Sequence, residues 1–223
     1  FLRQPKNLQW TEYTWAQVGD SVRRLASFLR GLDLPAASRI GIWSSNSKDW
    51  PIVDLAIMLS GHISVPLYPG QDLVSARYIL EHSGTEVIFL GGFDQWQGAD
   101  QAIPGNVQRV AMLGCKVPCQ DSLEDIFESC APFGESPIPD PNATFTIIYT
   151  SGTTGNPKGV EHAHITPGYA VPDLISAAHM EVGNTRFFSF LPMAHAAERI
   201  IVGMASIYSN GTVSFNEGLP TRA

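Results

Sequence analysis

The sequence predicts an α/β fold in which mixed, mostly parallel β-sheets are flanked by helices. In the first half of the chain, short apolar runs rich in Val and Ile alternate with segments of helical periodicity. This alternation is typical of βαβ units, whose strands pair in parallel. The composition agrees, because 44% of the 223 residues are hydrophobic and 16% are charged, as in a folded globular protein.

The first predicted helix follows Thr14. Thr14 and Gln17 have the spacing of a capping box, and Gly31 is placed to end the helix. The apolar residues of this segment recur along one helical face: Trp15, Val18, Val22, Leu25 and Leu29.

Strands and helices then alternate. Ser47 is expected to cap a second helix that Gly61 closes, and Asp72 is expected to cap a third. Strands are predicted at 39–44, 63–67, 86–90 and 107–113. The tryptophans near the starts of these elements are expected to anchor the core: Trp15, Trp43 and Trp50.

A proline-rich connector separates two predicted lobes. After a short helix at 122–129, the run APFGESPIPDPN contains four prolines, which prevent regular strand pairing. We therefore expect a first lobe at 1–132, a connector at 133–142 and a second, incomplete lobe at 143–223.

The second lobe opens with a strand at 144–150, and GVEHAH is expected to return as its hairpin partner. Thr166 and Pro167 suit the start of a helix, although Pro172 argues against helix in its early part. The remaining predicted elements are a strand at 187–192, a helix over AHAAERIIVGMASIYS that Asn210 and Gly211 end, and the strand TVSF.

The loop in YTSGTTGNPKGV (149–160) is the main functional signal. Glycines let backbone N–H groups approach an anion closely, hydroxyl groups add hydrogen bonds, and Lys158 adds a positive charge. A polar surface loop without a ligand is the alternative. A Walker A loop is excluded, because Pro157 stands where that loop needs glycine and Gly159 replaces its Ser or Thr.

Several motifs together resemble the adenylate-forming superfamily, which includes acyl-CoA synthetases, luciferases and peptide-synthetase adenylation domains. YTSGTTGNPKGV resembles its phosphate-binding loop, and FLPMAHAAER (190–199) resembles the next motif in the form that long-chain fatty acyl-CoA ligases carry. VPLYPG (65–70) and the SN(S)..W segment at 45–50 also fit that group. The resemblance implies the N-terminal part of the large domain of an acyl-CoA synthetase-like fold.

This resemblance implies a two-step ligase reaction. A long-chain fatty acid reacts with ATP to give acyl-adenylate and pyrophosphate, normally with Mg²⁺, and the thiol of coenzyme A then takes the acyl group. The motif places these residues at the β- and γ-phosphates of ATP: Thr150, Ser151, Gly152, Thr153, Thr154, Gly155 and Lys158.

The resemblance also singles out His195, at the wall between the nucleotide and acyl pockets. Glu198 and Arg199 follow at i+3 and i+4, where they could orient His195, support the loop or form a surface ion pair. His162 and His164 have a spacing that a metal pair could use, but without a third ligand we expect a structural role. No metal ligand or catalytic residue is assigned, and we expect the adenosine site and the catalytic lysine beyond Ala223.

The sequence leaves other functions open. The chain starts without Met and stops just past a strand, so we expect a fragment that lacks a working active site by itself. A fatty acyl-AMP ligase, a carboxylic acid reductase and a shortened non-catalytic binding module are the alternatives. The net charge of −7 argues against nucleic acid as a partner, and the odd count of three cysteines favours reduced thiols in the cytoplasm. Contact with a membrane surface is compatible with a hydrophobic substrate, and the oligomeric state is open.

Overall fold

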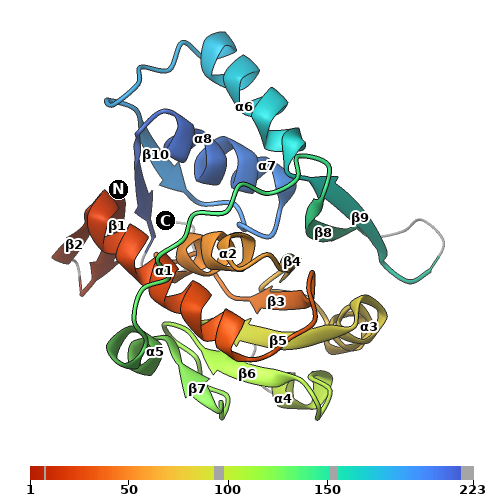
Figure 1. Cartoon of the computed structure of the whole chain (residues 1–223). Helices are drawn as coiled ribbons and strands as arrows, with labels where there is room; N and C mark the ends of the chain where they lie inside the picture. Colours follow the sequence, from red (N-terminus) through yellow and green to blue (C-terminus); the bar gives the residue numbers. More distant parts are fainter. Residues whose placement is uncertain (8, 93–97, 151–154, 217–223) are drawn as a thin grey trace.

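Two β-sheets organise the computed structural model, which describes residues 1–7, 9–92, 98–150 and 155–216 (Figure 1). The larger sheet has the order β7 (Asp121–Ser122), β6 (Gln108–Ala111), β5 (Thr85–Leu90), β3 (Arg39–Trp43), β4 (Ile63–Leu67), β8 (Thr144–Thr150) and β9 (Lys158–Ala163). The smaller sheet has the order β10 (Arg186–Ser189), β11 (Thr212–Phe215), β1 (Leu2–Lys6) and β2 (Gln9–Tyr13).

Strand pairing confirms the predicted mixed, mostly parallel α/β fold. In the larger sheet, neighbouring strands pair in parallel from β7 through β8, and the β8–β9 pair is antiparallel. In the smaller sheet, β10, β11 and β1 pair in parallel and β1 pairs with β2 as an antiparallel hairpin. Strands β1 and β2 were not predicted from the sequence; burial alternates along β1, whereas β2 is almost entirely exposed.

Helices cover both faces of the larger sheet. Residues of α1 (Trp15–Gly31), α2 (Asp49–Leu59) and α5 (Leu123–Ser129) share a core with one face of this sheet and with the inner face of the smaller sheet. The opposite face packs against α3 (Leu73–Ser83) and α4 (Ala99–Ala102). The helices α1 and α2 therefore lie in the middle of the molecule (Figure 1).

Two of the predicted N-caps are confirmed, those at Thr14 and Asp72. The capping box at Thr14 is present, with the Gln17 N–H donating to Thr14 Oγ1 at 3.2 Å and the Thr14 N–H donating to Gln17 Oε1 at 2.8 Å. Asp72 caps α3. The expectation for Ser47 is wrong by one position, because Lys48 is the N-cap of α2 and has no side-chain cap; Ser47 Oγ accepts only a long hydrogen bond from the Asp49 N–H, at 3.3 Å.

The second half of the chain departs from the prediction at three places. Helix α6 (Ile165–Ala177) begins before Thr166 and contains Pro172, so the proline does not exclude the helix. Strand β10 ends at Ser189, three residues earlier than predicted. The predicted long helix is formed by α7 (Ala196–Glu198), a π-helical segment η1 (Arg199–Met204) and α8 (Ala205–Tyr208).

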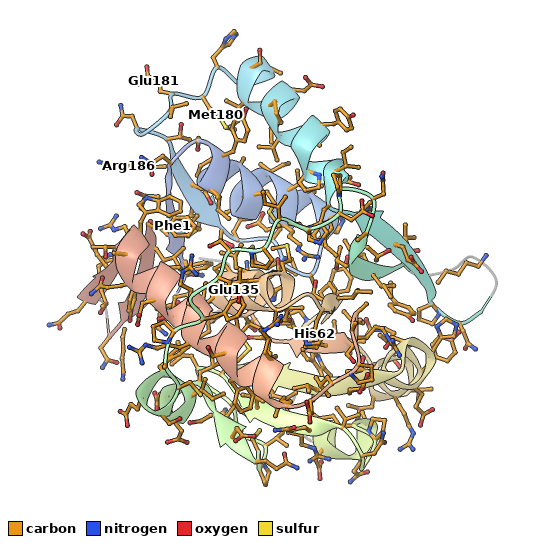
Figure 2. All side chains as sticks on the ribbon, viewed as in Figure 1. Phe1, His62, Glu135, Met180, Glu181 and Arg186 are labelled. Atoms are coloured by element: carbon orange, nitrogen blue, oxygen red, sulfur yellow. The ribbon has the colours of Figure 1, made fainter. Side chains whose placement is uncertain are left out.

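Both sheets take strands from both sides of the proline-rich connector. Strand β8 pairs with β4 at Ser64 and Thr146, and β1 pairs with β11 at Leu2 and Val213. The connector that carries Glu135 crosses α1 (Figure 2). At this crossing the Arg23 guanidinium donates to the carbonyl oxygen of Glu135 at 2.8 Å. The division into lobes at 133–142 stays a prediction.

The three tryptophans do not all anchor the core. Trp43 and Trp50 are fully buried, as predicted. Trp15 is 38% exposed and stacks on Phe1 with ring centroids 3.7 Å apart, so the prediction for Trp15 is wrong. Within the described part of the chain, no helix is both long and apolar enough to span a membrane.

Candidate active site

The predicted phosphate-binding loop connects the two strands of the β8–β9 hairpin. Thr150 at the end of β8 pairs in register with Lys158 at the start of β9, and both residues are exposed. Gly155 has a φ of 137°, a backbone conformation that favours glycine. Ser151, Gly152, Thr153 and Thr154 lie outside the described residues. The hairpin thus presents a cation and a hydroxyl-bearing residue side by side at its loop end.

Tyr149 fixes the end of β8 just before this loop. Its ring is buried, and its hydroxyl lies 2.8 Å from Nδ1 of His82 on α3. Burial raises the pKa of the Tyr149 hydroxyl, and the proximity of Tyr78 raises it further. Tyr149 therefore remains a neutral hydrogen-bonding group around neutral pH, and it ties the hairpin to α3.

The absence of a side chain at Gly159 leaves room for Ile147 and Tyr149 to pack against the β9 backbone. A Cβ atom at this position would come 2.8 Å from Cγ2 of Ile147 and 3.1 Å from Cζ of Tyr149. Such distances are too short for a side chain in a packed sheet. Packing within the hairpin therefore requires glycine at position 159, where a Walker A loop would have Ser or Thr.

His195 lies at the N-cap of α7, on the loop that follows β10. Its Nδ1 accepts a hydrogen bond from the Ala197 N–H at 3.1 Å, so Nε2 is the ring atom left for a ligand. The His195 side chain is exposed, and its ring meets Tyr68 edge-on with centroids 6.4 Å apart. The structure therefore brings two of the sequence motifs together, because Tyr68 belongs to VPLYPG.

Glu198 supports the loop that carries His195. Its Oε1 accepts hydrogen bonds from Ser189 Oγ at 2.9 Å and from the Phe190 N–H at 3.0 Å. Burial raises the pKa of Glu198, while these hydrogen bonds oppose the shift. Glu198 thus holds the segment that follows β10, while a role in orienting His195 or in supporting the phosphate-binding loop stays a prediction.

Arg199 is buried and forms an ion pair with Asp54 of α2. Its Nε donates to Asp54 Oδ2 at 2.9 Å and its Nη2 donates to Oδ1 at 2.5 Å. The same guanidinium donates to Thr146 Oγ1 at 2.6 Å and to Ser64 Oγ at 2.9 Å. Arg199 therefore joins the helix after His195 to α2, β4 and β8, and the surface ion pair that the sequence allowed with Glu198 is not formed.

The helix after His195 packs beside the hairpin. A small cavity of about 10 Å³ is lined from both sides, by Ala196 and Arg199 of the helix and by Ile148 and His162 of the hairpin. The predicted phosphate loop and the His195 segment consequently share one region of the molecule.

The paired histidines have separate surroundings. His164 is the N-cap of α6 and its ring lies against Phe145, with centroids 5.4 Å apart. Burial lowers the pKa of His164. Among the residues that the structure describes, no three His, Cys, Asp or Glu side chains are grouped as metal ligands.

Sequence reasoning missed the partners of the named residues. Asp54, Ser64 and Thr146 complete the Arg199 network, and His82 completes the Tyr149 anchor. One signal was present, since Asp54 interrupts an otherwise apolar run and a buried carboxylate needs a cationic partner.

The sequence profile of the family described as AMP-binding enzyme matches residues 4–223. The chain belongs to this family of adenylate-forming enzymes.

Long-chain ligases are among its relatives. The chain is 29% identical over 223 residues to the long-chain-fatty-acid–CoA ligase FadD15 of Mycobacterium bovis, and the alignment covers 94% of this chain and 36% of that protein. It is 29% identical over 248 residues to long-chain-fatty-acid–CoA ligase 6 of Homo sapiens, covering 97% and 34%. It is 27% identical over 225 residues to fatty acyl-CoA synthetase A of Dictyostelium discoideum, covering 95% and 33%. The chain thus spans about a third of the length of these curated relatives.

Solved structures share the fold. A benzoate CoA ligase from Burkholderia xenovorans superposes with a TM-score of 0.81 at 19% identity, covering 96% of this chain and 42% of that one. The inhibitor-bound N-terminal domain of FACL13 from Mycobacterium tuberculosis gives 0.77 at 23% identity, covering 98% and 53%. ATP-bound MatB from Rhodopseudomonas palustris gives 0.77 at 17% identity, covering 94% and 41%. Because these sequence identities are below 25%, the superpositions show a shared fold only.

Proposed function

We propose that the protein activates a long-chain fatty acid with ATP, forming an acyl-adenylate and pyrophosphate, and then transfers the acyl group to coenzyme A. Membership in the AMP-binding enzyme family supports the adenylation step. Relatives named as long-chain-fatty-acid–CoA ligases support the substrate and the acceptor.

The observation that carries the proposal is the β8–β9 hairpin. It brings exposed Thr150 and Lys158 into register at the loop end of a hairpin whose strand β8 is fixed by Tyr149 and Arg199. A hydroxyl and an ammonium group at one end of a glycine-containing hairpin fit a polyphosphate, because both donate hydrogen bonds to phosphate oxygens. The donor set therefore fits the triphosphate of ATP.

In this proposal the side chains neutralise charge on the phosphates and orient the fatty acid, and they form no covalent bond with either. Lys158 compensates negative charge on the leaving pyrophosphate, and the hydroxyl of Thr150 donates a hydrogen bond to it. His195, whose Nδ1 is occupied by the Ala197 N–H and whose ring lies edge-on to Tyr68, uses Nε2 to orient the carboxylate of the fatty acid. A base is not required, because a fatty carboxylate is already ionised near neutral pH. Mg²⁺ supplies further charge neutralisation when it enters with ATP, and no described residue is assigned to hold it.

The test is product analysis of the protein as encoded by its gene. The protein is incubated with ATP, Mg²⁺ and a panel of fatty acids of increasing length, with and without coenzyme A, and products are identified by mass spectrometry. We expect acyl-CoA only when coenzyme A is present, together with AMP and pyrophosphate.

Other results would support the alternatives. Acyl-adenylate that accumulates and is not consumed by coenzyme A would indicate a fatty acyl-AMP ligase or a reductase domain. Nucleotide binding without turnover of any fatty acid would indicate a non-catalytic module and would contradict the proposal.

A further inference from the structure

Asn46 contacts the loop that carries His195 from a distant part of the chain. It follows β3, where the Ser45 N–H donates to the Gly92 carbonyl oxygen at 2.9 Å and holds this segment at the carboxyl edge of the larger sheet. The carboxyl edge of a parallel sheet is where ligands bind in open α/β folds.

The side-chain amide of Asn46 makes three hydrogen bonds to residues 189–193. Its Oδ1 accepts from the Met193 N–H at 2.8 Å, and its Nδ2 donates to the Leu191 carbonyl oxygen at 2.6 Å. Its Nδ2 also donates to Ser189 Oγ at 2.8 Å. The amide thus bonds to the backbone on both sides of Pro192, as a neighbouring strand would.

The turn formed by residues 189–193 also fixes the backbone of His195. The His195 N–H donates to the Pro192 carbonyl oxygen at 2.8 Å, and Pro192 is the residue that Asn46 brackets. On the other side, Ser189 Oγ donates to Glu198, so the loop is held between Asn46 and Glu198. Strand β10 has already ended at Ser189, so the turn cannot rely on sheet pairing.

The residue type matters at this position. Asparagine offers an acceptor and two donors on one short side chain. Aspartate has the same shape but lacks the N–H groups, and it would place a carboxylate beside the Leu191 carbonyl oxygen. Alanine lacks every one of these hydrogen bonds.

We propose that Asn46 is a positioning residue of the adenylation reaction, which sets the backbone of the 189–195 loop and thereby the place of the His195 imidazole. The reaction part of this inference rests on the proposed function. The structural part, that Asn46 holds the loop, stands by itself.

The structural part is tested by hydrogen–deuterium exchange of the protein as encoded by its gene. Asn46→Ala should raise exchange at least several-fold in peptides covering 189–197 and leave peptides of β3 and β5 unchanged. Asn106→Ala removes an exposed asparagine from a surface turn and should match the wild type throughout. Unchanged exchange at 189–197 in Asn46→Ala would overturn the inference.

The reaction part is tested by a double-mutant cycle on fatty-acid-dependent pyrophosphate release. We expect Asn46→Ala to lower kcat at least tenfold and to change KM for ATP less than threefold. In a His195→Ala background the same substitution should lower kcat less than twofold further, because Asn46 acts through His195. Equal losses in both backgrounds would show a general structural role and would contradict the inference.

Two further outcomes are covered, a variant that does not fold and a wild type that shows no activity. If Asn46→Ala does not fold, Asn46→Asp takes its place, because it retains the acceptor for the Met193 N–H and loses only the donated bonds; the same criteria apply. If the wild type releases no pyrophosphate with any fatty acid, the proposed function fails, and the exchange experiment still decides whether Asn46 holds the loop.

Discussion

The positively charged side chain of Arg199 is buried, and the carboxylate of Asp54 neutralises its charge. The pair is accompanied by hydrogen bonds to Ser64 and Thr146 and by the rings of Phe145 and Trp50, at 4.8 and 5.8 Å from the guanidinium carbon. A buried pair of this kind adds little stability over an apolar replacement, but losing one partner leaves an uncompensated charge. The ion pair and its hydrogen bonds hold β8 and the π-helical segment in one arrangement.

Removing one partner of this pair should be costly. We expect Arg199→Met to lower the free energy of unfolding by about 3–5 kcal/mol, because Asp54 would remain buried without a cation. Urea unfolding followed by circular dichroism measures this change. The double variant Asp54→Leu with Arg199→Met should recover much of the loss, and a single variant that costs less than about 1 kcal/mol would contradict this description of the pair.

Glu198 should give the stability of the protein a defined pH dependence. Its pKa is raised in the folded state by burial. A group with a raised folded pKa contributes stability below its unfolded pKa, about 4.3 for Glu, and loses that contribution as the pH rises through the folded value. We therefore expect the wild type to lose stability relative to Glu198→Gln as the pH rises above about 4. Thermal unfolding of both proteins across that range measures the difference, and a difference that grows in the opposite direction would contradict the assignment.

At the scale of elements, the β8–β9 hairpin depends on the close approach of Gly159 to Ile147 and Tyr149. Gly159→Ala should lower the free energy of unfolding by about 1–3 kcal/mol, because the added methyl overpacks the pair of strands. Gly168→Ala is the matched control: no atom lies within 4 Å of its Cβ position in α6, so it should be neutral or stabilising by about 0.5–1 kcal/mol. Equal effects of the two substitutions would show that the hairpin tolerates a side chain at 159.

Elements with local signals could be predicted from the sequence, and elements set by distant contacts could not. Thr14 and Asp72 cap helices through atoms within three residues, so their patterns were sufficient. Strand β1 pairs with β11 from the other end of the chain, and Pro172 is accommodated inside α6. The same holds for the site: the motifs indicated Lys158, His195 and the 45–50 segment that contains Asn46. The contacts of Asn46, Asp54 and His82 could not be predicted, because their partners lie far away in sequence.

At the scale of the whole molecule, both sheets interleave strands from before and after the connector. Strand β4 pairs with β8, and β1 pairs with β11, so neither predicted lobe has a complete sheet by itself. We expect thermal unfolding in a single cooperative transition, with equal calorimetric and van't Hoff enthalpies. Two separate transitions in the calorimeter would mean that the residues before and after the connector fold as independent units.

The central claim is that the β8–β9 hairpin binds the phosphates of ATP during activation of a fatty acid. Its most direct test is fatty-acid-dependent pyrophosphate release by the wild type, by Lys158→Met and by Lys116→Met, which removes another exposed lysine. The wild type and Lys116→Met should release pyrophosphate at the same rate. Lys158→Met should be slower by roughly 10- to 150-fold, the loss expected for one hydrogen bond to a charged group. An unimpaired Lys158→Met, or release that does not depend on the fatty acid, would contradict the claim.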